Sequence, residues 1–522
     1  MLHWRLIDSA SPKPVLQPGS TYDKEGIFTG CFWPTGPSGE KDQLTIFYTS
    51  VCKLPMHWTL PYTRGMEGLA AAVSKDAGKS WTKLAENPIL KEEPGEINVF
   101  GWRDPYLAPW PALDELRGEQ SLYGIISGGV REGGPTTFLY AVDPKNLTSW
   151  TYICPLLDLP KNFKPSEKWS ADLGWNLECT NFMTLSTPED AKQFLILGAE
   201  GGKERPWVEK TANGKLPVRT VRWAQWFCGN LQKDHIEEQI HMEYGFGGVL
   251  DHGVLYAANT LVDPKTDTRV MWAWIPEEDV TIDMCRLKGW NGCLGLPREL
   301  FLKVIPDVVK ALSTPLNDIA TMEMGPAGSQ KFTLRTLGIR PLKGLSVLRQ
   351  SELLRLTDVR VPAKDQPKQT TDIQSAHFEI SATVRLTPGS SNVGFILRHN
   401  QDGSIGTKVE FDMAQENIVV NRSSSTNDLS INTCPDLGPF TLFTQSKVGE
   451  EETQESLKLR IFGDGDVLEV FANDRFSLST MIYPPQDALG ISLFAEGDPE
   501  SVVFDSLEIW DMSSIHEGGS TV

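Results

Sequence analysis

Two carboxylates stand in settings that would suit them to chemistry on a glycosidic bond. Retaining hydrolysis of such a bond uses two carboxyl groups about 5–5.5 Å apart, one as nucleophile and one as proton donor. Asp104 lies in the segment 101–105 (GWRDP), where Arg103 places a cation beside the carboxylate and Pro105 restricts the backbone before it. On these residues alone an Asp that caps a turn is the more frequent case, because Asp-Pro is a common turn pair.

Glu178 is the second candidate. It lies in the segment 174–179 (GWNLEC), among apolar and aromatic neighbours. Burial among such neighbours raises the pKa of a carboxyl group, and an acid that stays neutral can donate a proton. A Glu on an edge strand that points to water is an equally good interpretation of the local sequence.

The strands that must position these side chains are visible as short apolar and β-branched runs separated by turn-forming residues. Helical periodicity is nearly absent, and one short helix is expected near 307–312. The first two thirds of the chain hold more antiparallel strand than a simple sandwich, which favours a propeller of four-stranded blades, although no repeat is visible. The expected strands include 44–51, 122–126, 194–197, 254–260 and 269–275.

The last third of the chain alternates more cleanly between apolar and polar residues. This pattern is typical of a β-sandwich, and the expected strands are 378–386, 393–399, 457–462, 467–471 and 502–510. We therefore expect an all-β protein with two domains. The predicted divisions are a propeller over 1–337, a linker over 338–349, a sandwich over 350–513 and a frayed tail over 514–522.

The composition excludes some partners. The 49 Lys and Arg residues stand against 68 Asp and Glu residues, so the formal charge of −19 disfavours nucleic acid and membrane surfaces. No apolar run reaches the roughly 18 to 20 residues that cross a bilayer, and the first ten residues lack the pattern of a signal peptide. Read literally, the protein is cytoplasmic, and secretion stays open if a segment precedes Met1. The eight scattered cysteines indicate neither metal ligation nor disulfides, no cofactor is expected, and the oligomeric state is open.

The combination and order of several motifs resemble glycoside hydrolase family 32, the invertases, inulinases, levanases and fructosyltransferases. The resemblance spans essentially the whole chain. The segments 54–65 (LPMHWTLPYTRG) and 126–130 (ISGGV) are most similar to the fungal fructosyltransferase and intracellular invertase branch. The motifs are YDKEGIFTG (22–30), FYT (47–49), RDP (103–105), WNLEC (175–179), DHGVLYA (251–257), WAW (272–274), LPREL (296–300) and LKLRIFGDGDVLEVFAND (457–474).

The resemblance implies a five-bladed propeller, with its first blade incomplete here, followed by a β-sandwich. It implies that Asp104 stabilises an oxocarbenium-like transition state and that Glu178 is the general acid and base. Arg103, Phe28 and Thr29 would line a fructose pocket. Trp58 is a further substrate-binding candidate, for which packing between blades is an equal alternative.

One family feature is missing. The family nucleophile is the Asp of an N-D-P-N-G or G-D-P-type motif on the innermost strand of the first blade, and the first 30 residues contain no such motif. Their only aspartates are Asp8, in a polar stretch, and Asp23, at the YDxxG position. We therefore expect negligible hydrolysis of sucrose and inulin by the chain as given, since a lost nucleophile commonly costs several orders of magnitude in rate.

Two hypotheses about function follow from the sequence. The first is an enzyme of the β-fructofuranosidase or fructosyltransferase type, which acts on sucrose or fructo-oligosaccharides by a retaining mechanism. The second is a non-catalytic carbohydrate-binding relative that keeps part of the pocket. The sequence does not distinguish water from a second sugar as the acceptor, because that choice depends on the shape of the acceptor side of the pocket.

Overall fold

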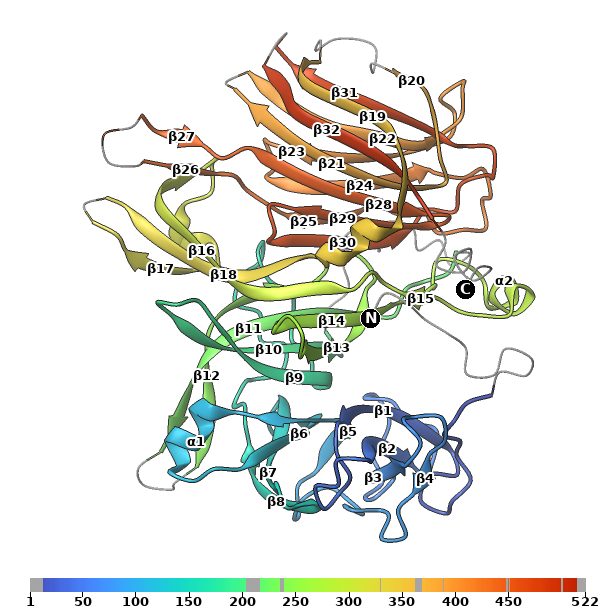
Figure 1. Cartoon of the computed structure of the whole chain (residues 1–522), viewed down its shortest axis with the longest axis vertical. Coiled ribbons are helices and arrows are strands. Elements are labelled where there is room, and N and C mark those ends of the chain that lie inside the picture. The colour runs from blue at the N-terminus through green and yellow to red at the C-terminus, as the bar shows by residue number, and fades with distance from the viewer. Residues whose placement is uncertain are drawn as a thin grey trace.

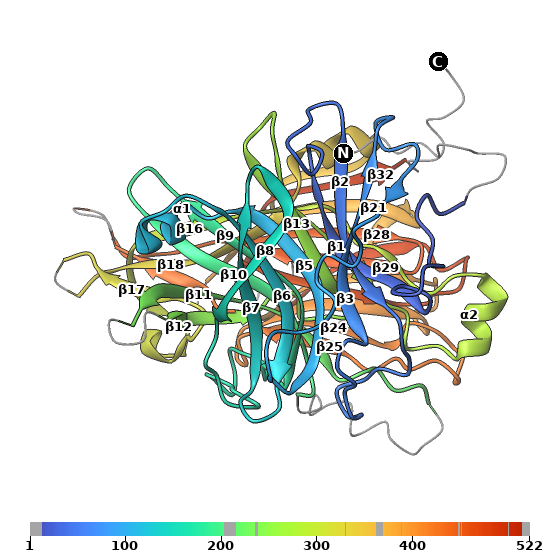
Figure 2. The same ribbon diagram turned by 90° about the horizontal axis from the view of Figure 1, so that it is seen from below.

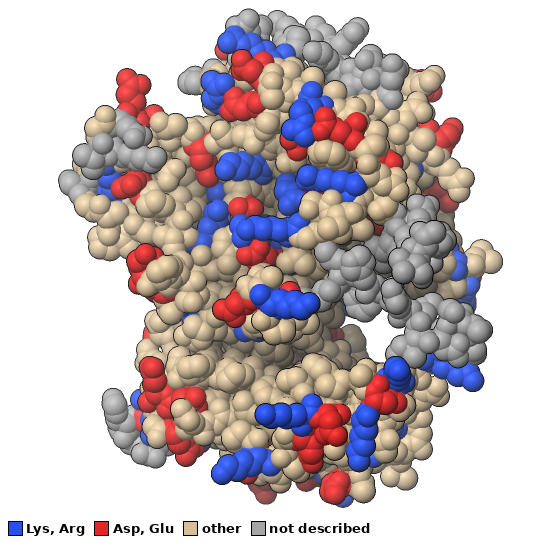
Figure 3. Space-filling model, in the orientation of Figure 1, with Lys and Arg blue, Asp and Glu red and all other residues tan. Residues whose placement is uncertain are grey.

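The structure of the chain is a computed structural model. It describes residues 13–202, 216–234, 239–328, 330–361, 369–387, 389–446, 449, 451–498 and 501–513. Nearly all of the secondary structure in these ranges is β-strand, and no helix within them is long and apolar enough to cross a membrane. On the face shown in Figure 3, acidic and basic side chains are interspersed over both halves of the molecule.

The N-terminal half consists of four antiparallel sheets that follow one another along the chain (Figure 1). The first contains β1 (Gly26–Trp33), β2 (Leu44–Val51), β3 (Glu67–Ser74) and β4 (Thr82–Lys83). The second contains β5 (Val99–Pro109), β6 (Leu122–Val130), β7 (Pro135–Asp143) and β8 (Asn146–Pro155). The third contains β9 (Asn176–Ser186), β10 (Ala191–Glu200), β11 (Arg222–Lys233) and β12 (Ile240–Val249). The fourth runs β13 (Tyr256–Asp263), β14 (Thr268–Ile275), β16 (Arg298–Ala311), β18 (Phe332–Pro341) and β17 (Glu323–Pro326), with β15 (Cys293–Leu294) beside β14.

The first strands of the four sheets surround a common centre. β1 contacts β5, β5 contacts β9 and β9 contacts β13, while the side-chain amide of Asn259 donates a 3.0 Å hydrogen bond from β13 to the carbonyl of Gly30 in β1. Figure 2, viewed from below, shows β1, β5 and β13 close together with the C-terminal half behind them. The expected propeller fold is thus confirmed. The expected blade count is not, because the described residues form four such sheets, and the first of them has four strands instead of an incomplete set.

The helix expected near 307–312 is wrong, because these residues end the long strand β16. A register shift between Ile305 and Val308, with Asp307 at a φ of 57°, interrupts the alternation of side chains and hides the strand in the sequence. The helices in the described ranges are α1 (Pro111–Arg117) and α2 (Ile282–Lys288), with 3-10 turns η2 (Leu316–Asp318) and η3 (Lys343–Leu348).

The C-terminal half packs two six-stranded sheets face to face over an apolar core, as the alternating pattern predicted. One sheet has the order β19 (Arg349–Arg360), β32 (Val502–Met512), β21 (His377–Leu386), β28 (Leu457–Asp464), β29 (Val467–Ala472) and β30 (Phe476–Met481). The other has the order β20 (Gln369–Gln374), β31 (Gly490–Gly497), β22 (Ser390–His399), β23 (Gly406–Asp412), β24 (Asn417–Ser424) and β25 (Asp436–Pro439).

The predicted linker is structured, and the two halves also share a sheet. Residues 338–341 belong to β18, and η3 fills 343–348. The hairpin β26 (Phe443–Gln445) and β27 (Thr453–Gln454) leaves the sandwich and pairs with β16 of the fourth sheet. The division into domains at 338–349 stays a prediction, and the expected tail, 514–522, lies outside the described residues.

Three of the sequence motifs meet in one buried network between the halves. The Arg298 guanidinium, which is fully buried, binds Asp251 Oδ2 and Glu469 Oε2, each at 2.8 Å. The same guanidinium donates to the hydroxyls of Ser477 and Ser479 on β30 at 3.0 and 2.6 Å. The motifs DHGVLYA, LPREL and LEVFAND therefore contact one another where the propeller meets the sandwich. Removal of any one partner would leave a buried charge in this network uncompensated.

We predict that Arg298→Met destabilises the protein by about 3–5 kcal/mol, because two buried carboxylates lose their cation. Chemical denaturation followed by tryptophan fluorescence measures this loss. The control Arg355→Met removes an arginine whose ion pairs lie on the surface, and its transition should stay close to that of the wild type. A loss below about 1 kcal/mol for Arg298→Met would show that the network contributes little to stability.

Candidate active site

The first strand of each sheet carries a β-bulge at a comparable place. The register shifts lie between Phe28 and Gly30 in β1, Arg103 and Tyr106 in β5, and Tyr256 and Asn259 in β13. In the third sheet, β9 shifts register over 178–181 against β10. Bulges turn side chains out of the regular alternation, so the four strands present side chains to one central site. One bulge therefore recurs in the first strand of each sheet. This recurrence is the structural repeat of the propeller, and the residue types do not reveal it.

Arg103 is the centre of this site. Its buried guanidinium donates to three carboxylates with three different nitrogens: Nε to Glu178 at 2.9 Å, Nη1 to Glu67 at 3.2 Å and Nη2 to Glu200 at 2.9 Å. Because these carboxylates come from β9, β3 and β10, one side chain joins all three of the first sheets. The planar fork of an arginine suits this arrangement, whereas the compact charge of a lysine does not.

Asp104 lies beside Arg103 and is 5% exposed. Its backbone has a φ of 62°, which non-glycine residues rarely adopt, and its amide donates to the hydroxyl of Thr49 at 2.7 Å. One carboxylate oxygen accepts from the Cys179 amide at 3.0 Å. Burial raises the pKa of Asp104 to about 7, with the negative charge of Glu178 as the next cause.

Glu178 lies next to Cys179, whose amide binds Asp104, and is therefore brought close to Asp104. Its carboxylate accepts from Arg103 through Oε1 and from the Tyr256 hydroxyl through Oε2 at 2.8 Å. It is 19% exposed, so it reaches the surface of the site while both oxygens stay oriented. An acid held in this way can meet an incoming oxygen atom without first being turned.

Sequence reasoning missed two further carboxylates. Glu67 is fully buried and accepts from the Trp102 amide at 2.8 Å as well as from Arg103. Glu200 accepts from the Asn176 side-chain amide at 2.9 Å, and burial, followed by the charge of Glu178, raises its pKa to about 7. Their signal in the sequence is a carboxylate at the end of an apolar strand, EGLAAAVS and QFLILGAE, which does not distinguish a site from a solvent-facing strand end.

The substrate-binding candidates differ in their placement. Phe28 is 39% exposed and Thr29 is also exposed, both at the β1 bulge, where the Thr29 carbonyl accepts from the hydroxyl of Thr49 at 3.1 Å. Trp58 is half-buried and packs edge-on against Trp175, with 5.3 Å between ring centroids. Trp175 directly precedes β9, which carries Glu178, so Trp58 packs close to the site. The roles of these residues stay predictions.

Asp23, the aspartate near the N-terminus that the structure describes, has a structural role. The Asp23 carboxylate is fully buried and accepts from two backbone amides, at Gly19 and Ser20, from the Tyr48 hydroxyl and from the Lys83 ammonium. These bonds hold its pKa below the ordinary value despite burial, and they leave it in a structural role. Asp8 lies outside the described residues.

The site is an arrangement for proton transfer and charge stabilisation. Among the described residues no group of three or more His, Cys, Asp or Glu side chains is arranged to hold a metal ion. A buried carboxyl group beside one that reaches the surface of the site fits the class of proteins that act on glycosidic bonds, which use carboxyl groups in pairs.

Comparison with known proteins assigns the family within that class. Residues 2–313 match the glycosyl hydrolases family 32 N-terminal domain and residues 346–511 match the glycosyl hydrolases family 32 C-terminal domain. The chain therefore belongs to glycosyl hydrolase family 32.

Individual relatives support this assignment over most of the chain. A levanase of Bacillus sp. (strain L7) is 26% identical over 99% of the chain. The structure of an Aspergillus kawachii β-fructofuranosidase complexed with glycerol has a TM-score of 0.81 at 27% identity, covering 97% of this chain and 86% of that one. A wild-type fructosyltransferase from A. japonicus has a TM-score of 0.82 at 26% identity, with 97% and 87% covered. The chain spans only 48% of the Bacillus sp. levanase and 54% of a Bacillus subtilis levanase, about half of their length.

The raised pKa values predict a pH dependence of stability. Asp104 and Glu200 hold protons up to about pH 7 in the folded state and only to about pH 4 when unfolded. The folded state therefore binds more protons between these values, and stability falls as the pH rises from about 4 to about 7, by up to roughly 1.4 kcal/mol per pH unit for each group.

We expect the double variant Asp104→Asn, Glu200→Gln to lose part of this decline, as measured by the melting temperature between pH 5 and pH 8 in steps. Glu452→Gln, which changes an exposed carboxylate, is the control. A double variant whose melting temperature declines as steeply as that of the wild type would refute the assignment of these protons.

Proposed function

We propose that the protein acts on the fructosyl unit of sucrose or a fructan by a retaining mechanism. The observation that carries the proposal is the placement of Asp104 and Glu178 on neighbouring central strands, where Arg103 binds Glu178 and the Cys179 amide binds Asp104. The names of its relatives, levanase, β-fructofuranosidase and fructosyltransferase, agree with a substrate of this class.

In the proposed reaction Glu178 donates a proton to the oxygen of the departing sugar. As the bond to that oxygen breaks, the fructosyl carbon bonds to a carboxylate nucleophile, which formate supplies in the experiment below. The deprotonated Glu178 then accepts a proton from the water or the second-sugar hydroxyl that displaces this carboxylate. Asp104, once it has lost its proton, stabilises the positive charge that develops on the fructosyl unit. The Arg103 guanidinium orients Glu178 through its Nε, and the Cys179 amide holds the carboxylate of Asp104.

The second candidate function is carbohydrate binding without turnover. Its support is the lack of an N-D-P-N-G motif in the first 30 residues together with the structural role of Asp23. Retaining hydrolysis forms a covalent bond between a carboxylate and the sugar. A site without that carboxylate can bind the substrate but cannot form the covalent intermediate. A small carboxylate such as formate can take the place of a missing nucleophile in solution, which separates the two candidates experimentally.

We predict that the purified chain of residues 1–522 releases fructose from sucrose in the presence of formate, and at a negligible rate without it. Glu178→Gln should lower the release by about two to four orders of magnitude, because the leaving oxygen is no longer protonated. A fructoside with an activated leaving group needs less protonation and should recover part of that rate. The assay measures fructose and glucose for both substrates.

Asp104→Asn is the matched comparison, because it also replaces one carboxylate by an amide of the same size. It should show no rescue by the activated leaving group, since charge on the fructosyl unit develops whichever group departs. Rescue of Asp104→Asn but not of Glu178→Gln would mean that the two roles are reversed. Saturable binding of sucrose by calorimetry, with no release even in formate, would favour the binding protein over the enzyme.

A further inference from the structure

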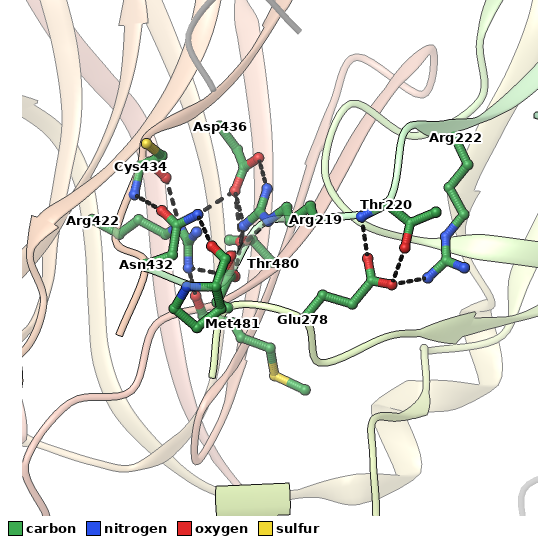
Figure 4. A network of polar contacts seen from close by, with 12 residues as sticks. Arg219, Thr220, Arg222, Glu278, Arg422, Asn432, Cys434, Asp436, Thr480 and Met481 are labelled. Carbon is green, nitrogen blue, oxygen red and sulfur yellow. Dashed lines mark hydrogen bonds and ion pairs between the residues drawn. The ribbon is translucent and has the colours of Figure 1, made fainter. Parts of the chain in front are cut away.

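A line of ion pairs runs between the sandwich and the active site. The ion pairs lie on two short segments (Figure 4). Residues 219–222 lead into β11, and residues 278–279 follow β14. Glu278 accepts from the Thr220 amide at 3.1 Å and the Thr220 hydroxyl at 2.7 Å. The same Glu278 pairs with Arg222 at 2.9 Å. The two segments therefore hold one another through charged and polar side chains of both.

The far end of this line is anchored in the sandwich. Arg219 pairs with Asp279 through two 2.7 Å bonds and with Asp436 of β25 at 2.6 Å. Arg422 of β24 pairs with Asp279 at 2.9 Å, and the Thr480 hydroxyl donates to Asp436 at 2.7 Å. The two arginines and two aspartates are all at least nine-tenths buried. Because their charges balance, loss of any one member leaves a buried charge unpaired.

The near end of the line lies against the active site. Arg222 stands directly opposite Glu200 in the pairing of β10 with β11. Its guanidinium lies 4.8 Å from the ring centre of Tyr256 and 5.2 Å from that of Trp274, two residues that face each other across β13 and β14. Tyr256 in turn donates its hydroxyl to Glu178.

We propose that Arg222 is a positioning residue, which fixes Tyr256 and Glu200 and through them orients Glu178, and that the sandwich holds Arg222 in place through Glu278 and Arg219. The inference rests on the proposed function, because it gives Glu178 the part of proton donor. A cation over an aromatic face restrains the ring, and the ring carries the hydroxyl that binds Glu178. The C-terminal half would thus contribute to the chemistry of a site that lies wholly in the propeller.

Arg222 also acts on the charge of the site. Its positive charge lowers the pKa of Glu200, against the larger effects of burial and of Glu178. Removal of that charge should therefore raise the pH at which Glu200 loses its proton. The titratable and charged groups that face the carboxylates of Glu178 and Glu200 from the surrounding strands are Glu67, Arg103, Asp104, Cys179, Arg222 and Tyr256.

The first test needs no substrate. The melting temperature of the protein is measured against pH. The readout is the pH at the midpoint of the fall in melting temperature that Glu200 and Asp104 cause. Arg222→Met should move this midpoint upward by roughly half a unit to one unit. Arg340→Met is the matched control, because Arg340 likewise pairs with a carboxylate, Glu299, and covers a ring, Phe301, away from the site. An unmoved midpoint in Arg222→Met, or an equal shift in Arg340→Met, would overturn the inference.

Two further variants test the link to the sandwich. Glu278→Gln keeps Arg222 but removes the negative charge that pairs with it. This variant replaces Arg222→Met in the experiment if Arg222→Met does not fold. Asp436→Asn changes a residue of the sandwich, on β25, that pairs with Arg219. Both should shift the midpoint in the same direction as Arg222→Met, by less. A midpoint equal to that of the wild type in Asp436→Asn would show that the sandwich does not hold Arg222.

The second test uses fructose release from sucrose in formate. Arg222→Met and Tyr256→Phe should each lower kcat by tenfold or more with KM changed less than threefold, because orientation of the proton donor matters most in the transition state. A rise in KM at constant kcat would instead assign Arg222 to substrate binding. If the wild type releases no fructose, the proposed function fails, and the midpoint without substrate still decides whether Arg222 controls the charge of the site.

Discussion

Four carboxyl groups gather around the single guanidinium of Arg103, and this imbalance of charge shapes the site. Glu67, Glu178 and Glu200 each take one nitrogen of the fork, and Asp104 lies beside it. Like charges at this separation cannot all be ionised in a buried site, so protons stay on some of them near neutral pH. Asp104 and Glu200 are the two groups whose pKa values burial and the charge of Glu178 raise to about 7.

The fold provides this arrangement through irregularities that recur from sheet to sheet. A regular strand would send successive side chains to opposite faces, whereas the bulge in each first strand turns its side chains toward the centre. The positive φ of Asp104 is a local cost of this geometry. It is held by the bond that the Asp104 amide donates to the Thr49 hydroxyl and by the bond that the Cys179 amide donates to the Asp104 carboxylate. The sandwich adds a second support, because its buried ion pairs with Arg298 and Arg219 fix the segments that enter the fourth sheet and β11.

The sequence predicts Asp104 and Glu178 because each lies in a short motif with a distinctive neighbour, and it predicts the fold class because strand patterns are local. Glu67, Glu200 and Arg222 could not be predicted in this way. Their importance arises from contacts across sheets, and their own segments look like ordinary strand ends. The helix expected near 307–312 failed for a related reason, since the bulge in β16 breaks the alternation that identifies a strand. The number of blades depends on how sheets close around an axis, which no local pattern encodes.

The central claim is that the carboxyl groups around Arg103 share protons near neutral pH. Infrared difference spectroscopy across a pH titration measures it most directly, because a protonated carboxyl group has a carbonyl stretch separate from that of a carboxylate. The account predicts a protonated carboxyl band that disappears with a midpoint near pH 7, and that is lost when Asp104 and Glu200 are both changed to their amides. A wild-type spectrum with no such band at pH 6, or a band unaffected by these substitutions, would contradict it.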